Sequence, residues 1–84
     1  MELNIATENI QRSSFLNLSN DYCITGTYLA DAGNLKAALE IFDKAIETNP
    51  NNHIAYFNRA TIKIDLGDLE GAKKDFNRFD LITK

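Results

Sequence analysis

The sequence is poor in the residues that stabilise small folds by covalent or metal bonds. It contains one cysteine, one histidine, one proline and no tryptophan among 84 residues. One cysteine cannot form an internal disulfide bond, and a single cysteine with a single histidine cannot complete a structural zinc site. These counts argue against a disulfide-stapled secreted module and against a zinc enzyme. We expect no metal and no cofactor.

Long apolar runs and targeting signals are also lacking. No uninterrupted apolar run approaches the length of about 20 residues that a membrane-spanning helix needs. The first eight residues, from Met1 to Glu8, lack the basic segment and apolar stretch of a signal peptide. We therefore expect a soluble cytoplasmic protein.

The charge is weakly negative. Nine basic and 12 acidic side chains give a net charge of −3. Nucleic acids and anionic membranes are bound through basic faces, so this balance argues against both as partners. The apolar fraction of 44% and the charged fraction of 25% are ordinary for a globular chain, which indicates one small folded domain.

An internal repeat with a period of 34 residues organises most of the chain. When residues 19–50 are compared with residues 53–84, seven of the 32 pairs are identical, whereas ordinary composition gives roughly two by chance. The identical pairs are Tyr22/Tyr56, Thr27/Thr61, Asp31/Asp65, Gly33/Gly67, Leu35/Leu69, Ala38/Ala72 and Phe42/Phe76. Two similar units in tandem are therefore expected.

Each unit has the pattern of two helices joined by a tight turn. Apolar residues from Leu35 to Ile46 recur at the i, i+3, i+4, i+7 spacing of an amphipathic helix. Gly33 and Gly67 suit the left-handed end of a preceding helix, and Asn34 and Asp68 suit the cap of the following one. Because Pro50 cannot continue a helix, it separates the units. The predicted helices are 19–32, 35–48, 53–66 and 69–82, which is an all-α fold of two tandem helical hairpins.

These positions resemble the tetratricopeptide repeat (TPR) family over residues 19–84. The resemblance implies a fragment of an α-solenoid and a non-catalytic scaffold or adaptor that binds a protein or peptide. The residues that carry it are Tyr22, Gly26, Leu29, Gly33, Asn34, Leu35, Ala38, Phe42, Ala45 and Pro50 in the first copy, and Tyr56, Ala60, Gly67, Asp68, Leu69, Ala72 and Phe76 in the second.

The second copy departs from the family pattern. Arg59 occupies a position that is usually apolar in the family, as does Thr25 in the first copy. Lys63 stands where the first copy has Leu29, and Phe79 stands where it has the small Ala45. We expect these changes to suit an end position or a different neighbour.

Two repeats are fewer than the three or more that usually stabilise such an array. We divide the chain into an N-terminal segment 1–18, repeat 19–52 and repeat 53–84. Residues 7–16 are expected to form an additional helix that covers part of the exposed repeat surface. The alternative cover is a second copy, because residues 1–52 carry a net charge of −4 and residues 53–84 a net charge of +1. A self-associating homodimer is therefore the alternative function.

The resemblance also implies a concave peptide groove lined by the first helix of each hairpin. The expected groove residues are Cys23, Ile24, Thr27, Asp31, Ile54, Phe57, Asn58 and Thr61. Asn58 matches an asparagine with which chaperone-binding members hold a peptide. Cys23 and Thr27 stand where those members have Lys and Asn, so a clamp for chaperone tails is not expected. The alternatives are that Asn58 bonds to a neighbouring helix and that the apolar groove residues are simply buried.

The remaining reactive side chains favour no enzyme. No Lys or His lies at helical spacing from Cys23 to lower its pKa, so we interpret Cys23 as a small hydrophobic residue. His53 is interpreted as a solvated residue at a helix start. Asp43, Glu47, Asp75 and Asp80 alternate with lysines and arginines, which predicts solvent-facing helix surfaces rather than an acid–base pair.

Overall fold

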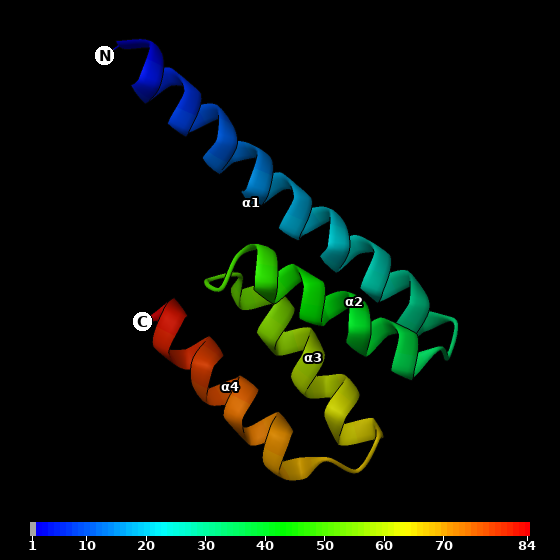
Figure 1. Ribbon diagram of the computed structural model, residues 1–84. Helices are drawn as coiled ribbons and strands as arrows, with labels where there is room; N and C mark the ends of the chain where they lie inside the picture. The colour runs from blue at the N-terminus through cyan, green and yellow to red at the C-terminus, as the bar shows by residue number, and fades with distance from the viewer. Residues whose placement is uncertain (1) are drawn as a thin grey trace.

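The computed structural model describes the backbone of residues 2–84 and the side chains of residues 14–84. Its helices are α1 (Glu2–Asp31), α2 (Leu35–Thr48), α3 (His53–Asp65) and α4 (Leu69–Thr83), and the described chain contains no strand. Figure 1 shows α1 antiparallel to α2 and α3 antiparallel to α4. The predicted all-α fold of two helical hairpins is confirmed, with helix ends within one residue of those expected for α2, α3 and α4.

The two hairpin turns have the same geometry. Gly33 and Gly67 both have φ of +85°, a conformation that residues with a Cβ rarely adopt. In each turn the residue after the glycine donates its backbone N–H to a carbonyl five residues earlier, Asn34 to Leu29 and Asp68 to Lys63. This is the Schellman arrangement. The repeat in sequence is therefore also a repeat of turn structure.

Only one of the two predicted side-chain caps forms. The Asp68 carboxylate accepts the backbone N–H of Gly71, whereas the Asn34 side chain makes no cap hydrogen bond. A side-chain cap that was not predicted starts α3, where the Asn52 side chain accepts the backbone N–H of Ala55 at 3.2 Å.

The N-terminal segment differs from the expected separate helix. Helix α1 runs without a break from Glu2 to Asp31, because no proline and no glycine interrupts the chain before Gly26. Figure 1 shows its first half projecting beyond α2. Among the described residues α1 contacts α2 and α3 but not α4. The side chains of residues 7–13, on which most of the expected cover depends, lie outside the described residues. The division into 1–18, 19–52 and 53–84 stays a prediction.

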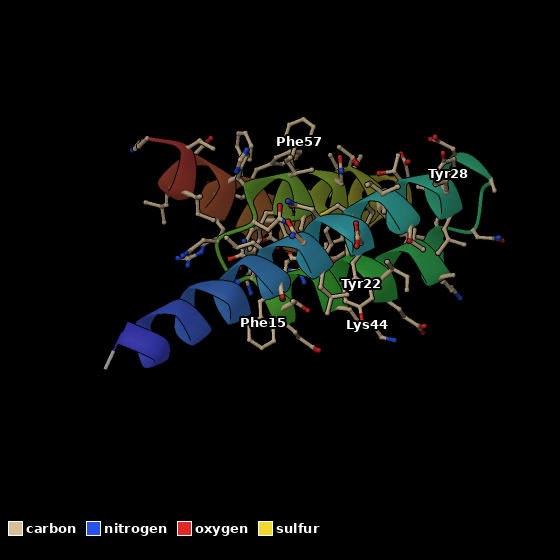
Figure 2. All side chains as sticks on the ribbon, turned by 90° about the horizontal axis from the view of Figure 1, so that it is seen from above. Phe15, Tyr22, Tyr28, Lys44 and Phe57 are labelled. Carbon is tan, nitrogen blue, oxygen red and sulfur yellow. The ribbon has the colours of Figure 1, made fainter. Side chains whose placement is uncertain are left out.

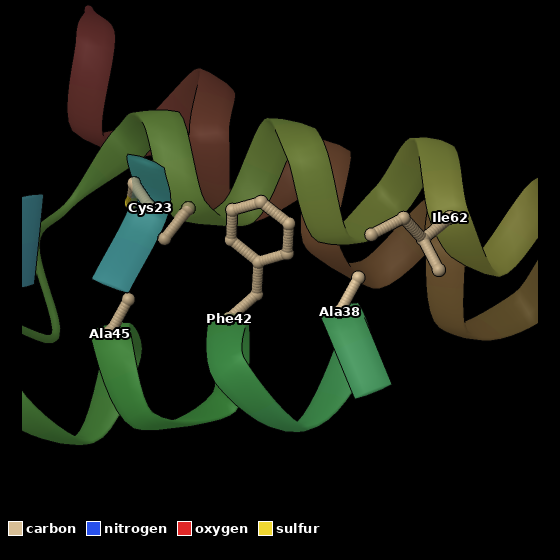
Figure 3. Packing of buried hydrophobic residues seen from close by; sticks show 6 residues of the cluster. Cys23, Ala38, Phe42, Ala45 and Ile62 are labelled. Atoms are coloured by element: carbon tan, nitrogen blue, oxygen red, sulfur yellow. The ribbon is translucent and has the colours of Figure 1, made fainter. Parts of the chain in front are cut away.

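The core is thin and centres on one aromatic ring. Phe42 is buried with Cys23, Ala38, Ala45, Ala55 and Ile62. Figure 3 shows the Phe42 ring pointing from α2 toward α3, between Cys23 and Ile62. A Cβ built on Gly26 would lie 2.8 Å from two carbons of that ring. Helix α1 can therefore approach α2 closely only because residue 26 has no side chain.

A polar junction closes the end of this core. The Ser19 hydroxyl donates to the carbonyl of Ala45 at 2.6 Å, and the Asn52 Nδ2 donates to Ser19 Oγ at 2.9 Å. Ser19 and Asn52 are both buried. Because the three residues belong to α1, α2 and the start of α3, the junction fixes the second hairpin against the first.

We expect Gly26→Ala to destabilise the fold by about 1 kcal/mol. Alanine gains about 1 kcal/mol of helix propensity, but overpacking against Phe42 costs about 1–3 kcal/mol. Urea denaturation measures the difference, and Gly26→Ala should cost less in a Phe42→Leu background than in the natural protein, because the smaller side chain relieves the contact. A stabilised single variant would contradict the close approach of the two helices.

Candidate functional site

A groove opens between the first helices of the two hairpins. Its volume is about 560 Å³. It is lined by six residues of α1 and one of α3: Asn20, Cys23, Ile24, Thr27, Tyr28, Asp31 and Ile54. Figure 2 shows Tyr28 and Phe57 on one side of the molecule and Phe15, Tyr22 and Lys44 on the other.

The spacing of the lining residues follows from helix geometry. Residues 20, 24, 27 and 31 follow one another at steps of three or four positions, and residue 28 lies four after 24 and three before 31, so these residues share one side of α1. Ile24, Tyr28 and Ile54 are 57%, 73% and 48% exposed, which is high for large apolar side chains that share a concave surface. The walls of the groove are thus apolar and accessible to a ligand.

Asn20, Thr27 and Asp31 add polar groups to the lining of the groove. Asn20 Oδ1 accepts a hydrogen bond from Asn52 Nδ2 at 3.2 Å, and Thr27 Oγ1 donates to the carbonyl of Cys23 at 2.8 Å. The amide nitrogen of Asn20, the lone pairs of Thr27 and the exposed carboxylate of Asp31 can therefore contact a ligand. The arrangement can bind an apolar segment with hydrogen-bonding groups or a cation beside it.

Cys23 contributes packing rather than reactivity. It is buried in the core, and its sulfur lies 3.4 Å from Asn52 Nδ2. Burial raises the pKa of the Cys23 thiol, and the hydrogen bond from Asn52 offsets only part of that rise. A thiol with a raised pKa is a poor nucleophile at neutral pH.

The structure brings together five of the eight predicted groove residues. Cys23, Ile24, Thr27, Asp31 and Ile54 line the groove, and Tyr28 was missed, although its position four residues after Ile24 was a usable signal. The other three do not line it. Phe57 packs against α4, and the Thr61 hydroxyl donates to the carbonyl of Asn58 at 2.7 Å. In the described part of the chain, the Asn58 side chain makes no hydrogen bond to another helix.

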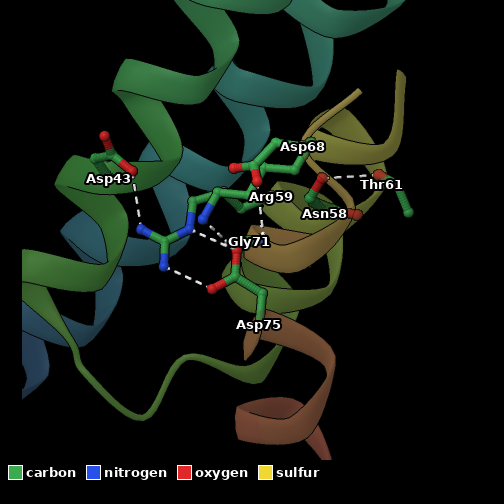
Figure 4. Close-up of polar contacts among 8 residues, drawn as sticks. Asp43, Asn58, Arg59, Thr61, Asp68, Gly71 and Asp75 are labelled. Carbon is green, nitrogen blue, oxygen red and sulfur yellow. Dashed lines mark hydrogen bonds and ion pairs between the residues drawn. The ribbon is translucent and has the colours of Figure 1, made fainter. Parts of the chain in front are cut away.

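The interpretation of Asp75 as a solvent-facing residue is wrong. Its side chain is only 5% exposed and forms ion pairs with Arg59 at 2.7 Å and Lys63 at 3.0 Å. Arg59 also pairs with Asp43 at 2.8 Å, and Figure 4 shows its guanidinium between the two carboxylates. Arg59 and Lys63, which depart from the family pattern, therefore supply the positive charges of an ion-pair network that joins α2, α3 and α4.

Burial and hydrogen bonding act in opposite directions on the pKa values of Arg59 and Asp75. The hydrogen bond to Asp75 raises the pKa of Arg59 further above its ordinary value, although burial opposes the rise. Burial raises the pKa of Asp75, but the hydrogen bonds from Arg59 and Lys63 outweigh it, so that pKa lies below its ordinary value. Arg59 and Asp75 are therefore both charged at neutral pH.

Comparison with known proteins agrees with this geometry. Two models of the tetratricopeptide repeat match, one over residues 22–52 and one over residues 41–74. An uncharacterized protein of Methanocaldococcus jannaschii is 37% identical over 71 residues, which are 84% of this chain and 76% of that protein. The chain belongs to the tetratricopeptide repeat family.

Two other relatives are longer than this chain. Tetratricopeptide repeat protein 36 of Danio rerio is 44% identical over 55 residues, which are 66% of this chain and 29% of that protein. DnaJ homolog subfamily C member 3 of Rattus norvegicus is 40% identical over 53 residues, 63% of this chain and 10% of that protein. The chain therefore spans less than a third of these two proteins.

Membership gives the general class of function. TPR domains are protein–protein interaction modules and are generally non-catalytic. In residues 2–84 no helix is long and apolar enough to cross a membrane. The side chains of residues 14–84 include no cluster of histidine, cysteine and carboxylate groups suited to hold a metal ion.

We expect Arg59→Leu to destabilise the protein by about 2 kcal/mol. The substitution leaves the Asp75 carboxylate nearly buried with Lys63 alone, and removing one partner of a buried pair is costly. Urea denaturation gives the magnitude. Asp43→Asn is the matched control, because it removes the half-exposed arm of the same network and should cost about 0.5 kcal/mol. Equal effects of the two variants would contradict the assignment.

The network also predicts a loss of stability in acid. The pKa of Asp75 is lower in the folded than in the unfolded chain, so the unfolded chain binds more protons at low pH. The stabilisation is therefore complete above the ordinary pKa of 3.8 and decreases as the pH falls through the folded value. Urea midpoints measured from neutral pH to below about pH 4 should fall less steeply for Asp75→Asn than for the natural protein. Parallel curves would refute this contribution.

Proposed function

We propose that the protein binds a segment of a partner protein, as an extended peptide or an amphipathic helix, in the groove between α1 and α3. The observation that carries this proposal is the exposed apolar lining of a concave surface of about 560 Å³, in a chain whose family consists of protein-binding modules. Ile24, Tyr28 and Ile54 would hold apolar side chains of the segment. Asn20 and Thr27 would bond to its backbone, and Asp31 would favour a basic residue near one end.

A peptide selected from a random phage-displayed library provides a defined probe for the groove. We expect Tyr28→Ser and Ile24→Ser each to weaken binding of such a peptide at least about tenfold, because exposed aromatic and aliphatic anchors carry most of the binding energy of small interfaces. Fluorescence anisotropy gives the Kd. Leu69→Ser is the matched control, because Leu69 is equally apolar and 65% exposed but lies outside the groove.

The site of binding can be followed independently by amide chemical shifts. The peptide should shift the resonances of residues 20–31 and of Ile54 more than those of α4. Either of two results would refute the proposal: no library peptide binds better to this protein than to an unrelated helical protein, or the groove variants bind as tightly as Leu69→Ser.

A second candidate function is self-association. Phe15, Leu16 and Leu18 on α1 are exposed, and so is Phe57 on α3. Phe15, Leu16 and Leu18 lie within about one turn of α1, and exposed apolar side chains grouped in this way mark candidate interaction surfaces. A homodimer would bury it without using the groove, so both functions are compatible in one molecule.

A further inference from the structure

The two helices that form the groove differ in how their charges are used. Between residues 14 and 31, α1 carries Asp21 and Asp31 and has no lysine or arginine. Helix α3 carries Arg59 and Lys63, but both form ion pairs with the nearly buried Asp75 of α4. These two basic side chains therefore face α4, and neither of them lines the groove. The charges left to act on a ligand in the groove are negative.

Two carboxylates mark one end of the groove. Asp31 is the last residue of α1 and Asp65 is the last residue of α3, and both are exposed. Figure 1 shows α1 and α3 running in the same direction, with the two hairpin turns at the same end of the molecule. Among the side chains of residues 14–84, neither Asp31 nor Asp65 forms an ion pair. The turn end of the groove thus has a negative charge that the described side chains do not balance.

The position of these carboxylates in their helices adds to that charge. The C-terminal end of a helix carries partial negative charge, so basic side chains stabilise this end and acidic ones oppose it. Helix α1 has no basic residue in its last turn, and Lys63 in the last turn of α3 is bound to Asp75. Asp31 and Asp65 therefore lie where the side chain and the helix end are both negative. A cation supplied by another molecule would be stabilised by both.

The apolar part of the groove lies beside this negative end at a defined distance. Ile24 and Tyr28 are exposed in the lining, and Asp31 follows Ile24 by seven residues on the same side of α1. Seven residues of helix correspond to about 10 Å. An extended chain covers that distance in about three residues. A ligand that matches the groove thus combines apolar side chains with a cation about three extended residues away.

We propose that the groove selects a cationic segment of a partner protein, with apolar side chains on Ile24 and Tyr28 and a lysine or arginine beside Asp31. The inference rests on the proposed function and specifies the chemistry of the partner. Charge complementarity is the argument for it, because the groove has an apolar lining and its one charged lining residue is a carboxylate.

An exchange of charges between protein and peptide tests this pairing. Peptides selected on the natural protein from a random phage-displayed library should contain an excess of lysine and arginine. For one such peptide, Asp31→Lys in the protein or replacement of the basic residue by glutamate in the peptide should each weaken binding about fivefold or more, because attraction becomes repulsion. The variant protein and the glutamate peptide together should recover most of the affinity. Fluorescence anisotropy gives the four Kd values.

Glu40→Lys is the matched control for the change in net charge. Glu40 is exposed on α2, four residues before Lys44, so the two share one side of that helix. Figure 2 shows Lys44 on the side of the molecule opposite Tyr28. This variant should bind the peptide within about twofold of the natural protein, because exposed charges outside the groove are screened by salt. Circular dichroism checks folding, and a lysine at the end of α1 should not destabilise that helix.

The failure of this inference differs from the failure of groove binding. Selected peptides without an excess of basic residues, or a glutamate peptide that binds the natural protein as tightly as its parent, would overturn the cationic partner and leave groove binding standing. Equal losses for Glu40→Lys and Asp31→Lys would overturn the pairing with Asp31. If no library peptide binds, the proposed function and this inference fail together.

Discussion

The position of α3 depends on the side-chain amide of Asn52. Its oxygen caps α3 through the N–H of Ala55, and its nitrogen donates to Ser19, Asn20 and Cys23 of α1. One residue therefore starts the second hairpin and fixes it to the first. Two of its partners, Asn20 and Cys23, line the groove, so the distance between the groove walls is set by the same amide. If α3 moved relative to α1, the buried Asn52 amide would lose these hydrogen bonds. The junction therefore favours one position of α3 as well as stabilising it.

The second hairpin is held differently. Where the first uses close packing of Phe42 on Gly26, the second adds a network in which Arg59 and Lys63 of α3 neutralise the nearly buried Asp75 of α4. Arg59 also reaches Asp43 of α2, so the network connects both hairpins. Desolvation offsets much of the attraction within such groups, and their main effect is to penalise any arrangement that separates the charges. The angle between α3 and α4 is thereby restricted without a large apolar core.

Much of the fold could be predicted from the sequence because it depends on local signals. Gly33 and Gly67, 34 residues apart, indicate the two turns, and the amphipathic runs that follow them indicate α2 and α4. Pro50 and the repeat indicate where α3 begins. The features that could not be predicted depend on contacts between distant residues. Asp75 looks like any acidic residue on a charged helix until α4 is placed beside Arg59. Asn52 looks like one of several loop asparagines until α1 lies next to it.

The continuity of α1 was missed because irregular apolar spacing in residues 1–18 suggested a separate element, although no glycine or proline marks an end there. The groove residues were taken from the family resemblance and stay a prediction, and five of them line the described groove. Which of the others contact a neighbouring helix depends on long-range packing, as the contacts of Phe57 with Phe76 and Phe79 of α4 show.

The same repeat that makes the fold predictable also explains why its two ends differ. A 34-residue shift carries the buried Ser19, Cys23 and Ala45 of the first hairpin onto His53, Phe57 and Phe79 of the second, which are larger, aromatic and less buried. In the first hairpin these positions contact the start of α3, and the Asn52 side chain there donates a hydrogen bond to Ser19. In the second, His53, Phe57 and Phe79 form contacts with one another instead, and His53 and Phe57 stay exposed. The groove and this aromatic cluster are lined by different residues, so substitutions in one leave the side chains of the other unchanged.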